Sequence, residues 1–167
     1  MSVNITEKAK RLTKSLEKRK EDRGVMADLK RGFSETTEDR SWPYISQWGC
    51  NIVENNERLV YQTVSAAYAF SKGNAGEGNM GTVCRSLAMG GHQGKKGLAS
   101  FEARFRRLLT CSSVNELSGH LAGIIRAAAA KNIAINFERL FSDLWWWSYS
   151  DKSKLQWASE YWKTEEE

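Results

Sequence analysis

Apolar side chains recur at intervals of three and four residues along most of this 167-residue chain. The longest such series runs through Leu117, Leu121, Ile124, Ile125 and Ala128. A helix of 3.6 residues per turn brings such positions to one face, so the spacing predicts amphipathic helices. No segment shows the alternation of a strand next to hairpin turn signals. We therefore predict an all-α fold, a compact bundle of about eight or nine helices that could divide into two helical halves.

Helix-capping residues mark where several of these helices should begin. Asn4 precedes the first one, which we expect to run to about Arg23 and to stop at Gly24. Asn136 and Asp151 precede the last two. A chain of this length, with 41% apolar residues, is typical of one folded domain. We expect residues 1–167 to form a single all-helical domain with an internal hinge near 72–81.

The segment Gly76-Glu77-Gly78-Asn79-Met80-Gly81 fits the dinucleotide-binding pattern G-x-G-x-x-G letter for letter. That site needs a preceding strand and a βαβ unit, whereas a helical pattern precedes the segment here. We interpret it as a loop in which Asn79 or Thr82 caps the next helix. The later Gly94-Lys95-Lys96 also fails the phosphate-loop pattern, because Lys96 stands where Ser or Thr is required.

Catalytic and metal chemistry have no positive signal in the sequence. His92 and His120 lack a second ligand at zinc-binding spacing, and no nucleophile motif is present. The three cysteines form no CxxC pair and are expected to be reduced thiols. Since no apolar run reaches the ~20 residues of a membrane span, we predict a cytoplasmic protein without a membrane partner. We expect no enzyme, no cofactor and no metal.

Charge is distributed unevenly along the chain, whose formal net charge is +5. Residues 80–131 hold eight basic and two acidic residues, a pattern that favours a polyanionic partner. Residues 1–31 are also basic, although mixed Lys and Glu there fit a solvated helix face equally well. Gathered on one surface, basic residues would bind phosphates without reading base sequence. The candidates are Lys30, Arg31, Arg85, Lys95, Lys96, Arg104, Arg107, Arg126 and Lys131.

Several segments together resemble the CasB family, the small subunit of the type I-E CRISPR surveillance complex called Cascade. They include Ala27-Asp-Leu-Lys30-Arg31-Gly-Phe, Asn79-Met-Gly81 before Arg85-Ser-Leu87, Glu102-Ala-Arg104-Phe-Arg-Arg-Leu108-Leu109 and Trp157-Ala-Ser-Glu-Tyr161-Trp162. Their order and spacing over about 27–162 carry the resemblance. It implies a non-enzymatic helical protein in a CRISPR antiviral complex. Two copies would stack against the backbone subunits that hold the guide RNA and beside the large subunit.

The resemblance also implies a role in stabilising the R-loop, the state in which the guide RNA pairs with target DNA. Basic surface residues would contact the RNA–DNA heteroduplex and the displaced DNA strand. Arg31, Arg85 and Arg104 match basic positions of the family pattern, whereas the other candidates rest on charge and placement. Where relatives often carry an arginine pair, this chain has Leu121-Ala122-Gly123, and Arg126 is a possible substitute.

Two alternatives stay open from the sequence. The first is a structural adaptor without direct nucleic-acid binding, in which the run Trp145-Trp146-Trp147 serves the core and a subunit interface. Adjacent helical positions lie 100° apart, so at least one of these rings should face outward. The second is a small enzyme whose site the sequence does not reveal.

Overall fold

The computed structural model describes residues 4–91 and 94–164. Over these residues the chain forms nine α-helices and two short 3₁₀-helices, with one isolated bridge and no strand, which confirms the all-α prediction. The α-helices are α1 (Ile5–Lys18), α2 (Arg23–Lys30), α3 (Trp42–Gln47), α4 (Asn55–Phe70), α5 (Met80–Met89), α6 (Lys96–Thr110), α7 (Val114–Ala130), α8 (Phe137–Trp146) and α9 (Lys152–Tyr161). The 3₁₀-helices are η1 (Arg31–Phe33) and η2 (Glu38–Ser41).

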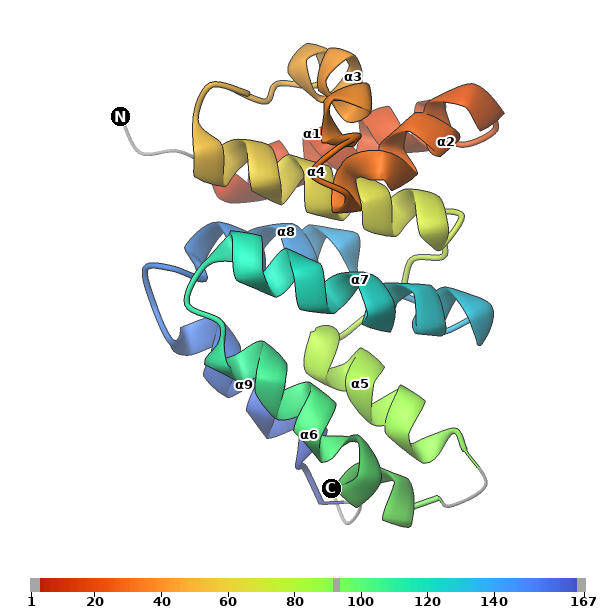
Figure 1. Cartoon of the computed structure of the whole chain (residues 1–167), viewed down its shortest axis with the longest axis vertical. Coiled ribbons are helices and arrows are strands. Elements are labelled where there is room, and N and C mark those ends of the chain that lie inside the picture. The colour runs from red at the N-terminus through yellow and green to blue at the C-terminus, as the bar shows by residue number, and fades with distance from the viewer. Residues whose placement is uncertain (1–3, 92–93, 165–167) are drawn as a thin grey trace.

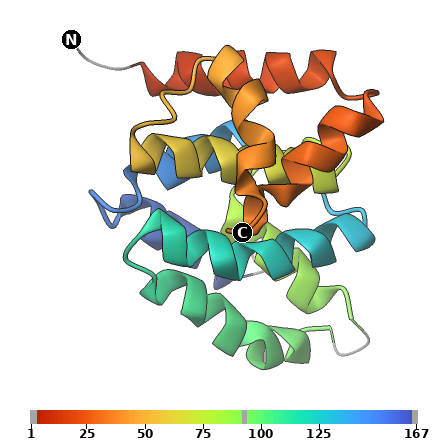
Figure 2. The ribbon, with the colours of Figure 1, turned by 45° about the horizontal axis from the view of Figure 1, so that its top comes forward.

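The helices lie in three tiers (Figure 1). Helices α1–α4 form one end, α7 and α8 the middle, and α5, α6 and α9 the other end; the rotated view in Figure 2 keeps α1 and α6 at opposite ends. The α4–α5 connector crosses the middle tier, where the Gly76 and Ile135 N–H groups donate to the carbonyls of Ile135 and Asn74, at 3.0 Å each. The hinge near 72–81 stays a prediction, and its motion would have to break these bonds.

One buried hydrophobic cluster draws residues from all nine α-helices. Within the first tier, helix α4 packs against α7 and α8 of the middle tier, and its residues 60–69 are buried on every face. Two of its buried polar side chains are paired: Thr63 and Ser118 hydroxyls lie 2.9 Å apart, and Trp42 Nε1 donates to Gln62 Oε1 at 2.7 Å, whereas the buried Ser65 hydroxyl has no hydrogen-bond partner among the described residues. No helix in the described part of the chain is long and apolar enough to cross a membrane.

The first helix boundary was predicted wrongly. Helix α1 ends at Lys18, and the Asp22 side chain accepts a hydrogen bond from the Val25 N–H at 3.1 Å. This cap begins α2 at Arg23, so Gly24 lies inside a helix rather than ending one. Asp151 also stands at a helix start without capping it, because Ser150 Oγ accepts from the Lys152 N–H instead.

The glycine-rich loop is accounted for by packing. The Asn79 side chain accepts from the Gly81 and Thr82 N–H groups, and Thr82 Oγ1 accepts from the Asn79 N–H. This confirms Asn79 as the cap of α5. Gly81 lies against the Trp157 backbone carbonyl of α9, and a Cβ at that position would overlap it. The glycine therefore sets the close approach of α5 and α9.

Substituting Gly81→Ala should lower the free energy of unfolding by about 3 kcal/mol, because the added methyl meets a backbone carbonyl that cannot rotate away. Gly119→Ala on α7 is the matched control. A Cβ at Gly119 meets nothing within 4 Å, so this change should stabilise the helix by about 0.5–1 kcal/mol. Denaturant unfolding monitored by circular dichroism measures both. Equal stabilities of the two variants would contradict the packing of α5 on α9.

Candidate nucleic-acid interface

Two candidate residues far apart in sequence meet at one aromatic ring. Lys30 ends α2, and its Nζ lies 5.4 Å from the centroid of the Phe70 ring. Arg126 lies on α7, and its Cζ lies 5.1 Å from the same centroid. Both side chains are exposed. Packing of α7 and α2 on the end of α4 thus places two like charges together, an arrangement that a bound anion would stabilise.

Arg104 extends this group from a third helix. It lies on α6 with its Cζ 5.0 Å from the Phe101 ring centroid. Its Nη2 lies 3.7 Å from the point where a Cβ would stand on Gly123, so the missing side chain leaves room for the guanidinium beside α7. Gly123 and Arg126 are three residues apart and share one side of α7. We call Lys30, Arg31, Arg104 and Arg126 the basic track.

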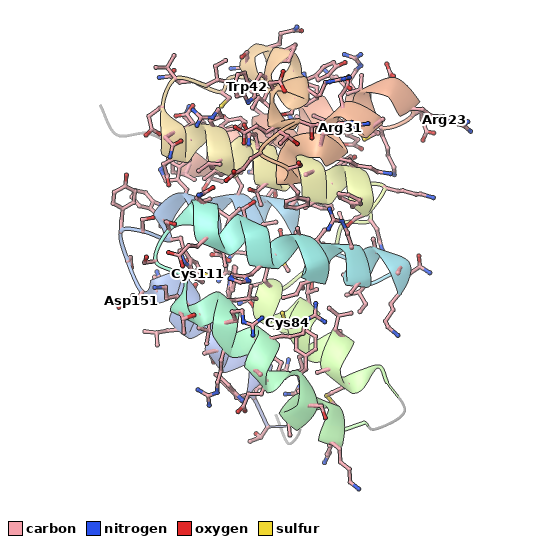
Figure 3. All side chains as sticks on the ribbon, in the orientation of Figure 1. Arg23, Arg31, Trp42, Cys84, Cys111 and Asp151 are labelled. Atoms are coloured by element: carbon pink, nitrogen blue, oxygen red, sulfur yellow. The ribbon has the colours of Figure 1, made fainter. Side chains whose placement is uncertain are left out.

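A cavity lies where the α1–α2 turn, α2 and the end of α4 meet, and Lys30 and Arg31 of the basic track line it. Its volume is about 650 Å³, and we call it the basic pocket. Figure 3 shows Arg23 and Arg31 at the two ends of α2. Sequence reasoning missed three of its cations, because they are spread over two segments with mixed charge. The charged residues of its lining are Lys20, Glu21, Arg23, Lys30, Arg31 and Lys72.

The pocket cations lack acidic partners within the described residues. The nearby carboxylates Asp22 and Asp28 pair instead with arginines outside the pocket lining. Arg19 pairs with Asp22 at 3.1 Å, and Arg40 pairs with Asp28 at 4.0 Å. The Arg31 side chain is exposed, and its guanidinium forms no ion pair within the described residues. Lysine and arginine groups of this kind can bind phosphate without first breaking a salt bridge.

Arg85 is placed differently from the track. It lies half-buried on α5, and its Nη1 donates to the Tyr161 carbonyl at 2.8 Å, which satisfies an end carbonyl of α9. One side of this guanidinium thus joins α5 to α9. Its role in nucleic-acid binding stays a prediction, and a variant of Arg85 would change the fold as well as the charge.

The remaining candidates are exposed but dispersed. Arg107 lies on α6, one turn after Arg104. Lys95 and Lys96 stand at the start of α6, and Lys131 stands at the end of α7. No contact among the described residues joins Arg107, Lys96 or Lys131 to the track. Their binding roles stay predictions.

The described part of the chain presents no cluster of metal ligands and no thiol of lowered pKa. No group of three His, Cys, Asp or Glu side chains there could hold a metal ion. His120 is exposed on α7, and His92 lies outside the described residues. Burial raises the pKa of Cys50 and of Cys84 to about 12, and it raises the pKa of Cys111 as well. These thiols stay protonated near neutral pH and are poor nucleophiles.

The tryptophan run divides between core and surface, as its spacing predicts. Trp147 is buried, donates from Nε1 to the Cys111 carbonyl at 2.8 Å and lies 4.7 Å from the Trp157 ring, centroid to centroid. Trp145 is half-buried against Phe141. Trp146 is 48% exposed and forms an edge-to-face pair with Tyr149. Only Trp146 of the three is therefore well placed to meet a partner.

Comparison with known proteins agrees with the resemblance seen in the sequence. A search of curated proteins finds no match to this chain. Two crystal structures from Thermus thermophilus share its fold, each with a TM-score of 0.71 over 93% of this chain and 98% of theirs. One is a CRISPR-associated protein of the Cse2 family, 21% identical, and the other is CasB, 23% identical. The family model for CRISPR-associated protein Cse2 matches residues 25–162, so the chain belongs to the CRISPR-associated Cse2 family, which includes CasB.

Proposed function

We propose that this chain is a non-catalytic small subunit of a CRISPR RNA-guided surveillance complex and stabilises its R-loop. Its basic track would bind the backbone of target DNA and hold the displaced strand. The observation that carries the proposal is the meeting of Lys30 and Arg126 at Phe70, with Arg104 joined to them along α7. Family membership supports a place in a CRISPR effector complex.

The energetics of an R-loop suit such a surface. Replacing a DNA duplex by an RNA–DNA heteroduplex is close to balanced in free energy, so modest backbone contacts can decide the outcome. The displaced strand competes for its complement unless it is held. Cations on three packed helices would hold it at fixed positions and without base preference, since phosphates carry no sequence information.

The partners in this proposal are a second copy of the chain, the backbone subunits, the large subunit, the guide RNA–target DNA heteroduplex and the displaced strand. The competing function is a structural adaptor that binds protein only. The exposed Trp146–Tyr149 pair favours it, because a partner protein could cover these rings. Trp146→Ala should then break assembly, while substitutions in the basic track should leave DNA affinity unchanged.

Salt dependence of binding by the isolated chain tests the proposal. The chain should bind single-stranded DNA weakly, with log K falling against log salt by about 0.7 for each phosphate contacted. Fluorescence anisotropy of a labelled oligonucleotide between 50 and 200 mM salt, about the range over which this effect is large, measures the slope. Binding that does not change with salt would contradict an electrostatic interface, and absence of binding would favour the adaptor.

A further inference from the structure

The basic pocket differs from the basic track in having an apolar floor. The apolar residues that line the cavity between α2 and α4 are Met26, Ala27 and Ala69, which we call its apolar floor, and the charged residues of the lining form its cationic rim. Ala69 is buried and Ala27 is exposed. Short side chains at these positions leave the volume open. An apolar floor beside a cationic rim matches the chemistry of one nucleotide, which has a base with a flat aromatic face and an anionic phosphate.

The size of the pocket fits a single unit of that kind. Its volume of about 650 Å³ lies within the ~300–1,000 Å³ typical of small-ligand sites. A base in a duplex is stacked and paired, and reaching a lateral pocket would require unstacking at a cost of a few kcal/mol. A base in a single strand meets a much lower cost. A nucleotide-binding pocket of this kind would therefore favour unpaired nucleic acid, which a surface of charges alone would not do.

The backbone at the rim supports a binding role. Lys72 has a φ of +52°, in the left-handed region, and Gly73 follows it at +71°. Glycine or asparagine usually occupies such positions after a helix, because other residues are strained there by about 1 kcal/mol. Lys72 thus places an ammonium group at the pocket despite a backbone cost. Strained residues of this kind cluster at ligand sites.

The charge balance of the lining points the same way. Five cations and one carboxylate, Glu21, surround the cavity. Lys20, Arg23, Arg31 and Lys72 form no ion pair within the described residues, so the excess positive charge is uncompensated there. One or two phosphates flanking a bound base would neutralise much of it, and each contact with an arginine or lysine would be a charge-assisted hydrogen bond.

We propose that the basic pocket takes one unpaired nucleotide of single-stranded DNA, with the base against Met26, Ala27 and Ala69 and the flanking phosphates at the cationic rim. The inference rests on the proposed function, since it names the form of nucleic acid that this part of the interface selects. It adds a site for a base to a surface otherwise described by phosphate contacts. The protein would then distinguish the displaced strand from duplex DNA by its unstacked bases.

The variant Ala27→Leu tests this pocket without changing charge. Leucine would fill the floor, and it suits helix α2 because its helix propensity is high. Ala103→Leu is the matched control, since Ala103 is also exposed on a helix but lies on α6, away from the pocket. Thermal unfolding of both variants should resemble that of the unmodified chain. The probe is a thymidine oligonucleotide, compared with the same oligonucleotide made abasic.

Unmodified protein and Ala103→Leu should bind the abasic strand about tenfold more weakly than the normal one, because base burial on the apolar floor is lost. Ala27→Leu should bind both strands equally, at the weaker level. Equal binding of both strands by the unmodified chain, or full affinity in Ala27→Leu, would overturn the pocket. The proposed function would still stand if charge reversal at Lys30 and Arg31 weakened binding in the same assay. If neither the missing base nor the charge reversal weakened binding, both the pocket and the proposed function would be overturned.

Discussion

Reversal of two charges in Lys30→Glu/Arg31→Glu is expected to weaken target-DNA binding by the assembled complex on the order of 100-fold. A hydrogen bond to a charged group contributes about 1.5–3 kcal/mol, and each ~1.4 kcal/mol is a factor of ten in affinity. Both side chains are exposed, and neither forms an ion pair within the described residues. The double variant should therefore retain its fold and its place in the complex.

Target binding is best measured by electrophoretic mobility shift with the complete ribonucleoprotein, together with the lifetime of the displaced strand in permanganate footprinting. The control is Lys10→Glu/Lys14→Glu, which makes the same change of net charge on the exposed side of α1. It should leave affinity within about twofold, because exposed charges beyond a Debye length of ~10 Å are screened. An equal loss of target-DNA affinity in the two double variants would indicate an effect of net charge alone. It would then contradict a specific role of the basic track in DNA binding.

Asp143→Ala should lower the free energy of unfolding by about 3 kcal/mol, or roughly 6–12 °C in Tm for a chain of this size. Asp143 is buried on α8 and accepts from Trp157 Nε1 at 2.7 Å, Ser153 Oγ at 3.1 Å and Arg139 Nε at 3.1 Å. Its removal leaves two buried donors and a partly buried guanidinium without their acceptor. Asp151→Ala, at a carboxylate that is 82% exposed, should change Tm by less than about 2 °C.

The effect of Asp143→Ala should also depend on pH. Burial raises the pKa of Asp143 above its usual 3.8, although the three hydrogen bonds and the Arg139 charge oppose the rise. The folded state then takes up a proton at a higher pH than the unfolded state does. The contribution of Asp143 to stability therefore grows as pH falls through its folded pKa towards 3.8. Calorimetry at several pH values should show a larger deficit in acid; a deficit that shrank would contradict this direction.

Local features of the sequence predicted much of the fold. The three-and-four spacing of apolar residues predicted the buried face of α7, and of the two residues predicted to cap α5, Asn79 or Thr82, it is Asn79 that stands at the cap. These predictions succeed because the periodicity of a helix and its cap depend on residues only a few positions apart. The error at the end of α1 has a local cause too, since Asp22 caps a new helix within a continuous basic segment.

The sequence by itself determined that the chain is helical, that its positive charge is concentrated in two blocks, and that it carries the pattern of the CasB family. The tertiary structure decided which of these charges lie close together. Helix packing brings Lys30 and Arg126 to the ring of Phe70, and it assembles Lys20, Arg23 and Lys72 around one cavity. It also places Arg85 Nη1 where it donates a hydrogen bond to the Tyr161 carbonyl at the end of α9. Helical periodicity fixes the face on which a residue lies, whereas distances between helices follow from how their side chains interlock across the whole core.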